Sequence, residues 1–253
     1  MSKFSYRNKP LGLYLHIPFC VKKCGYCDFY SVEDRELMKE YVSALLLHIR
    51  SYGKVCSGYT VDTVYIGGGT PTCLGPKYLG RILQEIRNKF PLAEDAEITV
   101  ECNPESTDKK VLDVMKKQGV NRLSFGVQSA HDEELRAIGR IHTFAQAKEA
   151  VELAREKGFA NISLDLMYGL PGQTQEMFWT RWSNVWDWNR SIYPAMGSSW
   201  SRGRRWDAKI LFCRMTMHRR IPILLCVSGC GTRDMNTTRS RILPSRAAAR
   251  VII

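Results

Sequence analysis

The sequence lacks the features that would place the protein in a membrane or outside the cell. It has no uninterrupted apolar run of about 18 residues, the length that a membrane-spanning helix needs. Residues 1–10 are mostly polar and contain no hydrophobic core of a signal peptide. Without a secretory signal, the nine cysteines are expected to stay reduced. We therefore expect a cytoplasmic protein whose cysteines bind metal or pack in the core.

The patterned part of the chain also lacks a nucleic-acid signature, although the net charge is +12. Residues 180–253 hold 14 of the 37 basic residues and 3 of the 25 acidic ones, which leaves 23 basic and 22 acidic residues in 1–179. A nearly neutral segment offers no basic face for phosphates. The chain has no Walker loop and no Ser/His/Asp set. Nucleic-acid binding is therefore an alternative that only a salt-dependent affinity of residues 1–179 for DNA or RNA would support.

Three cysteines stand close together after the first apolar run. Cys20, Cys24 and Cys27 have the spacing C-x3-C-x2-C, and no fourth cysteine comes before Cys56. Thiolates suit iron, and a [4Fe–4S] cube usually takes four of them. The simplest interpretation is a cube with one iron left open for a ligand that is not protein. The alternatives are a zinc site, for which only His16 is a nearby fourth ligand, a redox disulfide, which needs two cysteines rather than three, and three unrelated buried thiols.

Apolar, β-branched segments alternate with amphipathic segments up to residue 167. The predicted strands are 13–17, 61–66, 97–101, 122–128 and 161–167, and the predicted helices are 35–52, 77–89, 107–118 and 145–157. This alternation indicates βαβ units and a parallel sheet. Five units are too few to close an eight-stranded barrel, so we predict an α/β fold with an open, partial barrel.

Several short segments resemble the radical S-adenosylmethionine (SAM) superfamily. They are residues 15–20 (LHIPFC), the three cysteines and residues 67–71 (GGGTP). Within it, the chain resembles the anaerobic coproporphyrinogen III oxidase family, most closely its haem-chaperone branch, from about Tyr14 to about Gln175. The oxidases carry an extra cysteine just after the triad, where this chain has Asp28 and Phe29. The resemblance implies a partial TIM-like (β/α)6 barrel whose sixth unit should follow Gln175.

The resemblance also implies two cofactors and the residues that hold them. The three cysteines would bind a [4Fe–4S] cluster, and SAM would chelate its open iron through amino and carboxylate groups. An electron from the cluster would cleave the sulfonium and release a 5′-deoxyadenosyl radical. In the family the glycine run holds the methionyl end of SAM, and the aromatic residue inside the triad packs beside the adenine. Matched position by position, the expected SAM contacts are Tyr14, Tyr26, Gly68, Gly69, Thr70, Glu101, Gln128, Arg140 and Asp165.

Taken singly, most of these residues have an ordinary structural interpretation, such as core packing for Tyr26. Their shared placement strengthens them, because carboxyl ends of parallel strands meet at one edge. Glu101 and Asp165 are expected to accept hydrogen bonds from ribose hydroxyls or the SAM amino group, and Arg140 to pair with the carboxylate. Cys56, Cys73, Cys102 and His16 are expected to have structural roles. His131 and His142 are expected to be exposed.

The resemblance leaves two functions in competition. The first is a haem-binding chaperone of the radical SAM type, with an electron donor and a haem acceptor protein as partners. The second is an enzyme, an oxygen-independent coproporphyrinogen III oxidase that decarboxylates porphyrinogen propionates. The absence of the extra cysteine favours the chaperone. A decarboxylase assay set against a haem titration separates the two.

Residues 180–253 break the pattern of the core domain, residues 1–179. All six tryptophans fall between Trp179 and Trp206, arginine replaces lysine, and glutamate is absent. Each residue can be assigned one of the codons that encode it, and the resulting DNA can then be read from the third base of each codon. With suitable codon choices, residues 181–206 then yield LEQRVGLEPEHLSCYGLKLEPGTPL, and residues 234–244 yield YEHYEISNFA in the same frame. Both strings resemble the family's continuation, so we expect an out-of-frame, poorly ordered tail; a genuine Arg/Trp-rich extension is the alternative. On this interpretation the sixth strand and a C-terminal domain are missing, the fifth strand is an exposed edge, and the chain binds a cluster at best, with weak or no activity.

Overall fold

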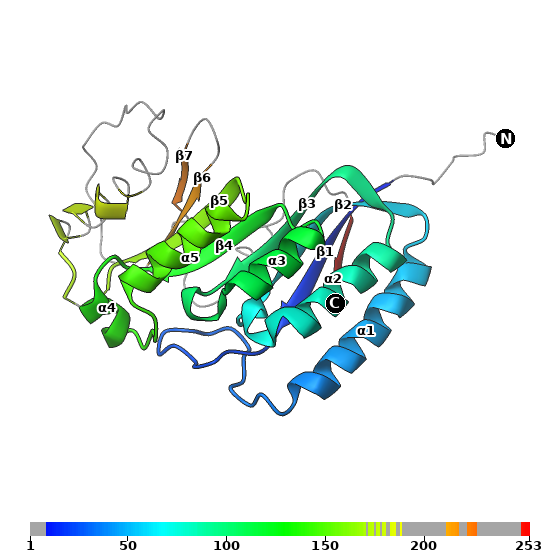
Figure 1. Cartoon of the computed structure of the whole chain (residues 1–253), viewed down its shortest axis with the longest axis horizontal. Coiled ribbons are helices and arrows are strands. Elements are labelled where there is room, and N and C mark those ends of the chain that lie inside the picture. The colour runs from blue at the N-terminus through cyan, green and yellow to red at the C-terminus, as the bar shows by residue number, and fades with distance from the viewer. Residues whose placement is uncertain are drawn as a thin grey trace.

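A computed structural model describes residues 9–170, 172–174, 176, 177, 179, 180, 183–185, 188, 211–217, 222–226 and 249–253. Its centre is a sheet of five parallel strands with helices between them (Figure 1). The strands are β1 (Lys9–Ile17), β2 (Tyr59–Gly68), β3 (Leu92–Cys102), β4 (Arg122–Gln128) and β5 (Asn161–Tyr168). The connecting elements are α1 (Met38–Val55), η1 (Pro71–Leu74), α2 (Gly75–Lys89), η2 (Pro104–Ser106), α3 (Lys109–Lys117), α4 (Asp132–Ala137) and α5 (Phe144–Glu156). The predicted α/β fold with five βα units is confirmed.

Local sequence signals explain where the last helices begin. The Asp108 carboxylate accepts from the Val111 amide (2.8 Å) and caps α3. Thr143 and Gln146 form a reciprocal capping box at the start of α5, which satisfies two otherwise unpaired amides. The short helix α4 was not predicted, because six residues with a single buried apolar side chain, Leu135, show no helical period.

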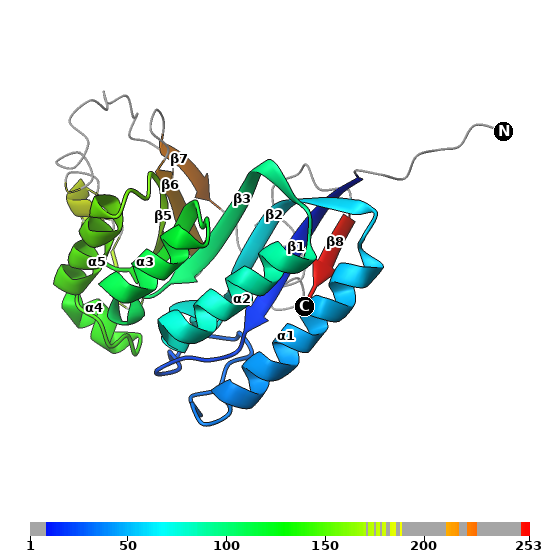
Figure 2. The ribbon, with the colours of Figure 1, turned by 45° about the vertical axis from the view of Figure 1, so that its right-hand side comes forward.

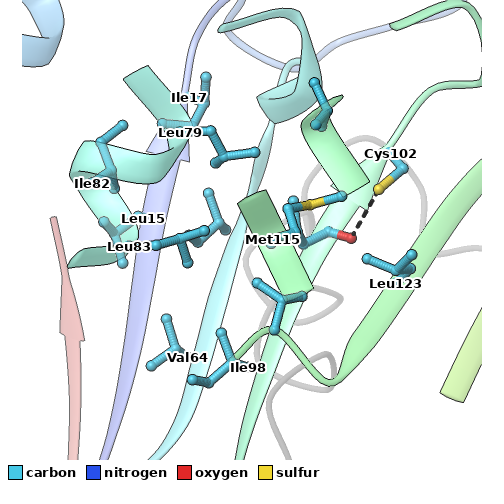
Figure 3. Close-up of a cluster of buried hydrophobic side chains, with 14 of the residues drawn as sticks. Leu15, Ile17, Val64, Leu79, Ile82, Leu83, Ile98, Cys102, Met115 and Leu123 are labelled. Carbon is cyan, nitrogen blue, oxygen red and sulfur yellow. Dashed lines mark hydrogen bonds between the residues drawn. The ribbon is translucent and has the colours of Figure 1, made fainter. Parts of the chain in front are cut away.

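The two faces of the sheet differ in chemistry. Figures 1 and 2 show α1, α2, α3 and α5 on one side of it. Side chains of the strands that point to these helices are apolar and buried, and they pack with helix residues such as Leu79, Ile82, Leu83 and Met115 (Figure 3). Because strand side chains alternate, the intervening positions lie on the opposite face, and there they are polar or aromatic: Tyr14, Tyr65, Thr99, Glu101, Arg122, Ser124, Ser163 and Asp165. Burial of the apolar side holds the sheet, at about 1.5–3 kcal/mol for each large side chain. The polar side is left to form a site.

Three further strands extend the sheet at its edges, in the order β7-β6-β5-β4-β3-β2-β1-β8. They are β6 (Leu211–Met217), β7 (Pro222–Cys226) and β8 (Ala249–Ile252). The prediction that the fifth strand is an exposed edge is wrong, because β6 pairs with β5 in antiparallel register and occupies its free backbone groups. Most other residues beyond 188 lie outside the described part of the chain, and with them most of the segment that we read in a shifted frame. Among the described residues, no helix has the length and apolarity to cross a membrane.

Candidate functional site

The loop after β1 carries the three cysteines and is fixed at both ends. Its first turn pairs with Val32, which accepts from the Cys20 amide (3.0 Å) and donates to the Pro18 carbonyl (2.7 Å). The glycine run after β2 holds the same turn, because Gly69 N donates to Ile17 O (2.7 Å) and Thr70 N to Phe19 O (2.6 Å). We call residues 18–31 the cysteine loop. Its backbone is therefore positioned by β1 and β2 together.

The three thiols are free and partly buried. Thr70 Oγ1 lies 3.7 Å from Cys20 Sγ, and Arg140 Nη1 lies 3.5 Å from Cys24 Sγ, so both sulfurs face a donor. Burial raises the pKa of the Cys27 thiol. In the described part of the chain, no three Cys, His, Asp or Glu side chains are placed to hold a single metal ion. A cube would bind each of the three thiolates on a separate iron.

The glycine run is required by close packing as well as by any ligand. A Cβ on Gly67 would lie 2.6 Å from a Glu101 carboxylate oxygen, and one on Gly69 would lie 2.6 Å from the Phe19 carbonyl. Gly68 has φ +115°, and a Cβ there would meet the His16 ring at 2.5 Å. A side chain at any of the three positions would therefore collide with its neighbours, which accounts for the glycines.

The β1–β3 side of the site gathers three of the predicted SAM contacts. Glu101 accepts from Tyr65 Oη (2.6 Å) and from the Gly68 amide (3.0 Å). The Tyr14 ring stacks on Tyr65 with centroids 6.0 Å apart. His16 lies beside them, with Nε2 2.9 Å from the Tyr30 carbonyl and Nδ1 3.2 Å from Tyr14 Oη. Because a carbonyl only accepts, His16 carries its proton on Nε2 and ties β1 to the cysteine loop. This is the structural role predicted for it.

The other half of the site is organised around Arg140. Its Nη2 donates to Asn103 Oδ1 (2.9 Å) and to the Gly126 carbonyl (2.7 Å), while Nη1 faces Cys24. Asn103 Nδ2 donates in turn to Thr70 Oγ1 (2.9 Å). A continuous polar chain thus runs from Cys20 through Thr70, Asn103 and Arg140 to Cys24. Asp165 lies further along the same face, where its Oδ2 accepts from Ser124 (3.2 Å).

Gln128 provides a direct test of whether a polar ligand fits. It is 7% exposed, and its Oε1 is buried with no hydrogen-bond partner among the described residues. A buried amide oxygen without a partner costs about 1–3 kcal/mol. Its Nε2 and the ends of Asn103 and Arg140 all lie within 3.2 Å of the point where a Gly126 side chain would begin. The residues present therefore fit a hydrogen-bonding group such as SAM.

Tyr26 completes the set of predicted contacts. Its ring packs against Ile138, Met167 and Leu170, and burial raises the pKa of its hydroxyl. The Gly25 amide donates to the Ile138 carbonyl (3.3 Å), so the segment after α4 touches the cysteine loop. Core packing accounts for part of this tyrosine's surface, as its structural interpretation allowed.

At the site, the structure corrects the expectation for one histidine and adds two residues. His142 is 3% exposed, contrary to the prediction, because it lies under the end of β4, whereas His131 is exposed as expected. Asn103 and Glu105 were missed, although Asn103 follows the third strand directly, where polar residues signal a site. Cys56, Cys73 and Cys102 are buried as predicted, and burial raises the pKa of all three thiols, that of Cys73 to about 12.

Known proteins share this architecture. The family model of the radical SAM superfamily matches residues 14–180. The chain belongs to the radical SAM superfamily. Members of this superfamily use a [4Fe–4S] cluster and SAM, so the predicted family and cofactor types are confirmed.

Relatives with 36–43% identity include haem chaperones and a porphyrinogen oxidase. Heme chaperone HemW of Escherichia coli (strain K12) is 43% identical over 169 residues, which are 66% of this chain and 45% of that protein. HemW of Bacillus subtilis (strain 168) is 43% identical over 164 residues, 64% of this chain and 43% of that protein. The structure of coproporphyrinogen III oxidase (HemN) from Escherichia coli, a radical SAM enzyme, matches with a TM-score of 0.68 and 36% identity over 74% of this chain and 43% of that one. The chain thus spans less than half the length of these radical SAM relatives.

Proposed function

We propose that this chain binds a [4Fe–4S] cluster and SAM in the site described above and acts as a haem-binding chaperone in the cytoplasm. The observation that carries the proposal is the position of Arg140. One guanidinium reaches the Cys24 sulfur, the Gly126 carbonyl and Asn103, beside a buried and unpartnered Gln128 oxygen. A fixed cation between a thiolate loop and an empty hydrogen-bonding position suits a zwitterionic ligand next to a cluster.

Each residue of the site has a proposed role in binding the cluster or SAM. Cys20, Cys24 and Cys27 hold the cluster, which supplies low-potential electrons when bound. Arg140 pairs with the SAM carboxylate, and Gly68, Gly69 and Thr70 bring backbone and hydroxyl groups to its methionyl end. Glu101 is held by Tyr65 and Gly68 so that it can accept further hydrogen bonds from SAM. Tyr14, Tyr26, Gln128 and Asp165 are the remaining residues that we propose to contact SAM.

Haem is the proposed cargo because the HemW relatives are named heme chaperones. The residues after the triad, Asp28 and Phe29, add to this, since they stand where the resemblance places an extra cysteine in the oxidases. An electron donor and a haem acceptor protein are the proposed partners. The second candidate, a coproporphyrinogen III oxidase, is favoured by one observation, the fold match to HemN at 36% identity.

The test combines a cofactor assay with a choice between the two functions. The full chain is reconstituted with iron and sulfide under anaerobic conditions, and its reduced cluster is examined by electron paramagnetic resonance with and without SAM. The expected result is a cube of about four irons whose spectrum shifts on addition of SAM. Haem titration and porphyrinogen turnover then follow. Absence of a cube refutes the proposal, and decarboxylation without haem binding replaces it by the oxidase.

We propose that residues 180–253, the tail, are translated from a shifted reading frame. We treat them as a segment distinct from the core of residues 1–179. The support is the shifted reading, in which one change of register accounts for two family-like strings. Resequencing the coding DNA around the Trp179 codon tests this. A single-base insertion or deletion is expected there, and an intact reading frame would establish the Arg/Trp-rich extension instead.

A further inference from the structure

His142 is buried and has a defined protonation on one nitrogen. Its side chain is 0% exposed, and Nε2 lies 3.2 Å from the carbonyl oxygen of Val127. A carbonyl oxygen only accepts, so Nε2 must carry a proton. His142 Nε2 therefore donates a hydrogen bond to the Val127 carbonyl of β4.

The other nitrogen of His142 faces a carboxylate. Nδ1 lies at ion-pair distance, 3.4 Å, from Glu105 Oε2, and both atoms are buried without a hydrogen-bond partner in the described part of the chain. If both groups were deprotonated at this contact, a lone pair would face a carboxylate with both atoms buried and unsatisfied. One proton shared between them would satisfy both atoms.

Glu105 is the member of the pair that is held ionised. Burial acts to raise the pKa of Glu105, but the hydrogen bond from His142 and the charge of Arg140 outweigh it, and the pKa of this carboxyl lies below its usual value. Glu105 faces His142 from η2, and Arg140, in the same loop as His142, acts on Glu105 through its charge. The contact therefore joins an ionised carboxylate to the Nδ1 side of a buried histidine.

The hydrogen bond from His142 to the Val127 carbonyl lies next to a residue with a strained backbone, Gln128. Gln128, the next residue, has φ +67°, and it is the only described residue other than glycine with a positive φ. The register between β4 and β5 shifts between Gly126 and Gln128. Such a conformation persists only where its surroundings hold it. His142 holds the Val127 carbonyl, and Arg140, two residues earlier in the same loop, holds the Gly126 carbonyl.

We propose that Glu105 and His142 form a one-proton positioning pair, which fixes the strained end of β4 and the loop carrying Arg140 so that Gln128 and Arg140 meet SAM. Neither member of the pair touches SAM itself. The inference rests on the proposed SAM binding and goes beyond it, because it assigns the geometry of the site to two residues outside the predicted contacts.

The variants Glu105→Gln and Glu105→Ala separate a proton-dependent contact from simple space filling. The glutamine amide donates to Nδ1 of a neutral His142, so it restores the contact without a shared proton. In the reconstituted full chain, E105Q is expected to bind SAM within about twofold of wild type, while E105A and H142F lose about tenfold, as for a lost hydrogen bond to a charged group. The matched controls are E94Q and H131F at exposed residues, which are expected to bind SAM as wild type does. Iron content and circular dichroism confirm that each variant is folded and loaded.

Two readouts respond to the proton rather than to packing. SAM affinity is measured by equilibrium dialysis between about pH 6 and about pH 9.5, and the histidine nitrogens are observed by ¹⁵N NMR, with His142 assigned by its loss in H142F. Wild type is expected to show protons on both ring nitrogens of His142 at neutral pH and to lose SAM affinity as that proton leaves. E105Q is expected to show a proton on Nε2 alone and a flat affinity profile.

The outcomes distinguish the two proposals. If the wild-type cluster-loaded chain binds no SAM, the proposed function fails, and NMR then decides on the pair alone. If His142 Nδ1 carries no proton in wild type, or if E105A matches E105Q in affinity and pH profile, the positioning pair is refuted even though SAM binds.

Discussion

Substituting Gly126 by alanine tests the site with one added methyl group. The new Cβ would lie 2.9 Å from Asn103 Oδ1, 2.9 Å from Gln128 Nε2 and 3.2 Å from Arg140 Nη2. Real contacts of this kind are longer, so the three polar ends must move. Each of them belongs to the proposed SAM pocket, and none belongs to the apolar core.

The magnitude follows from the bonds that the displacement breaks. Arg140 loses its geometry toward Asn103 or toward the Gly126 carbonyl, and a hydrogen bond to a charged group is worth about 1.5–3 kcal/mol. Since 1.4 kcal/mol is a tenfold change in affinity, we expect SAM binding to weaken by about 10- to 100-fold. Because these bonds lie within the protein, the free energy of unfolding should also fall, by about 1.5–3 kcal/mol less the roughly 0.4–1 kcal/mol that alanine contributes by restricting the unfolded chain.

The matched control is Gly80→Ala in α2. A Cβ there meets Val114 Cγ1 at the same 2.9 Å, but this contact lies between α2 and α3, away from the site. SAM affinity is measured on the anaerobically reconstituted protein by equilibrium dialysis, and stability by urea denaturation. Wild-type SAM affinity in G126A, or an equal loss in G80A, would refute the claim that Asn103, Gln128 and Arg140 form the pocket.

Three further predictions address the cluster, the pH dependence and the fold. Cys24→Ser is expected to lose the ~four-iron cube, whereas Cys56→Ser, at a buried cysteine outside the loop, keeps it; iron analysis decides, and equal iron in both would contradict the ligand assignment. Burial raises the pKa of Tyr41 to about 12, so wild type should lose stability as pH rises from about 10, where the unfolded tyrosine ionises, to about 12. Tyr41→Phe should flatten that loss in pH-dependent urea melts, and an unchanged slope would exclude Tyr41 as its source. Thr143→Ala removes the capping box of α5 and should cost about 1 kcal/mol in urea denaturation, with a cost near zero contradicting the cap.

The sequence was informative where local chemistry decides structure. Strand β4 matches its predicted bounds, and the other strands and the long helices were found with shifts of a few residues at their ends. The three cysteines and the glycine run were readable because their spacing is itself the signal. Pairing of β6 with β5 was not predictable, because partner choice at a sheet edge depends on segments distant in sequence.

The buried state of His142 was hidden for a different reason. It lies two residues from Arg140 in a loop without periodic pattern, next to the exposed Ile141, and sequence alone gives no direction for its side chain. Its partner Glu105 is 37 positions away in a three-residue turn after β3. Only the parallel order of β3 and β4 brings the two segments together at one end of the sheet.

The segment after α4 explains how the two halves of the site are held in one geometry. Residues 138–142 contact the cysteine loop through Ile138 O and Arg140, and the end of β4 through Arg140 and His142. Gly139, with φ +78°, lies against the cysteine loop, where a Cβ would come within 3.3 Å of Gly25 N. A strained Gln128 and a buried unpaired oxygen are unfavourable for the empty fold, yet they occur where this segment fixes the backbone from two sides. Backbone strain and unpaired buried polar atoms are expected at binding sites, where a ligand can supply the missing interactions. Both occur at the end of β4, and this coincidence is the strongest physical argument for SAM binding at this end of the sheet.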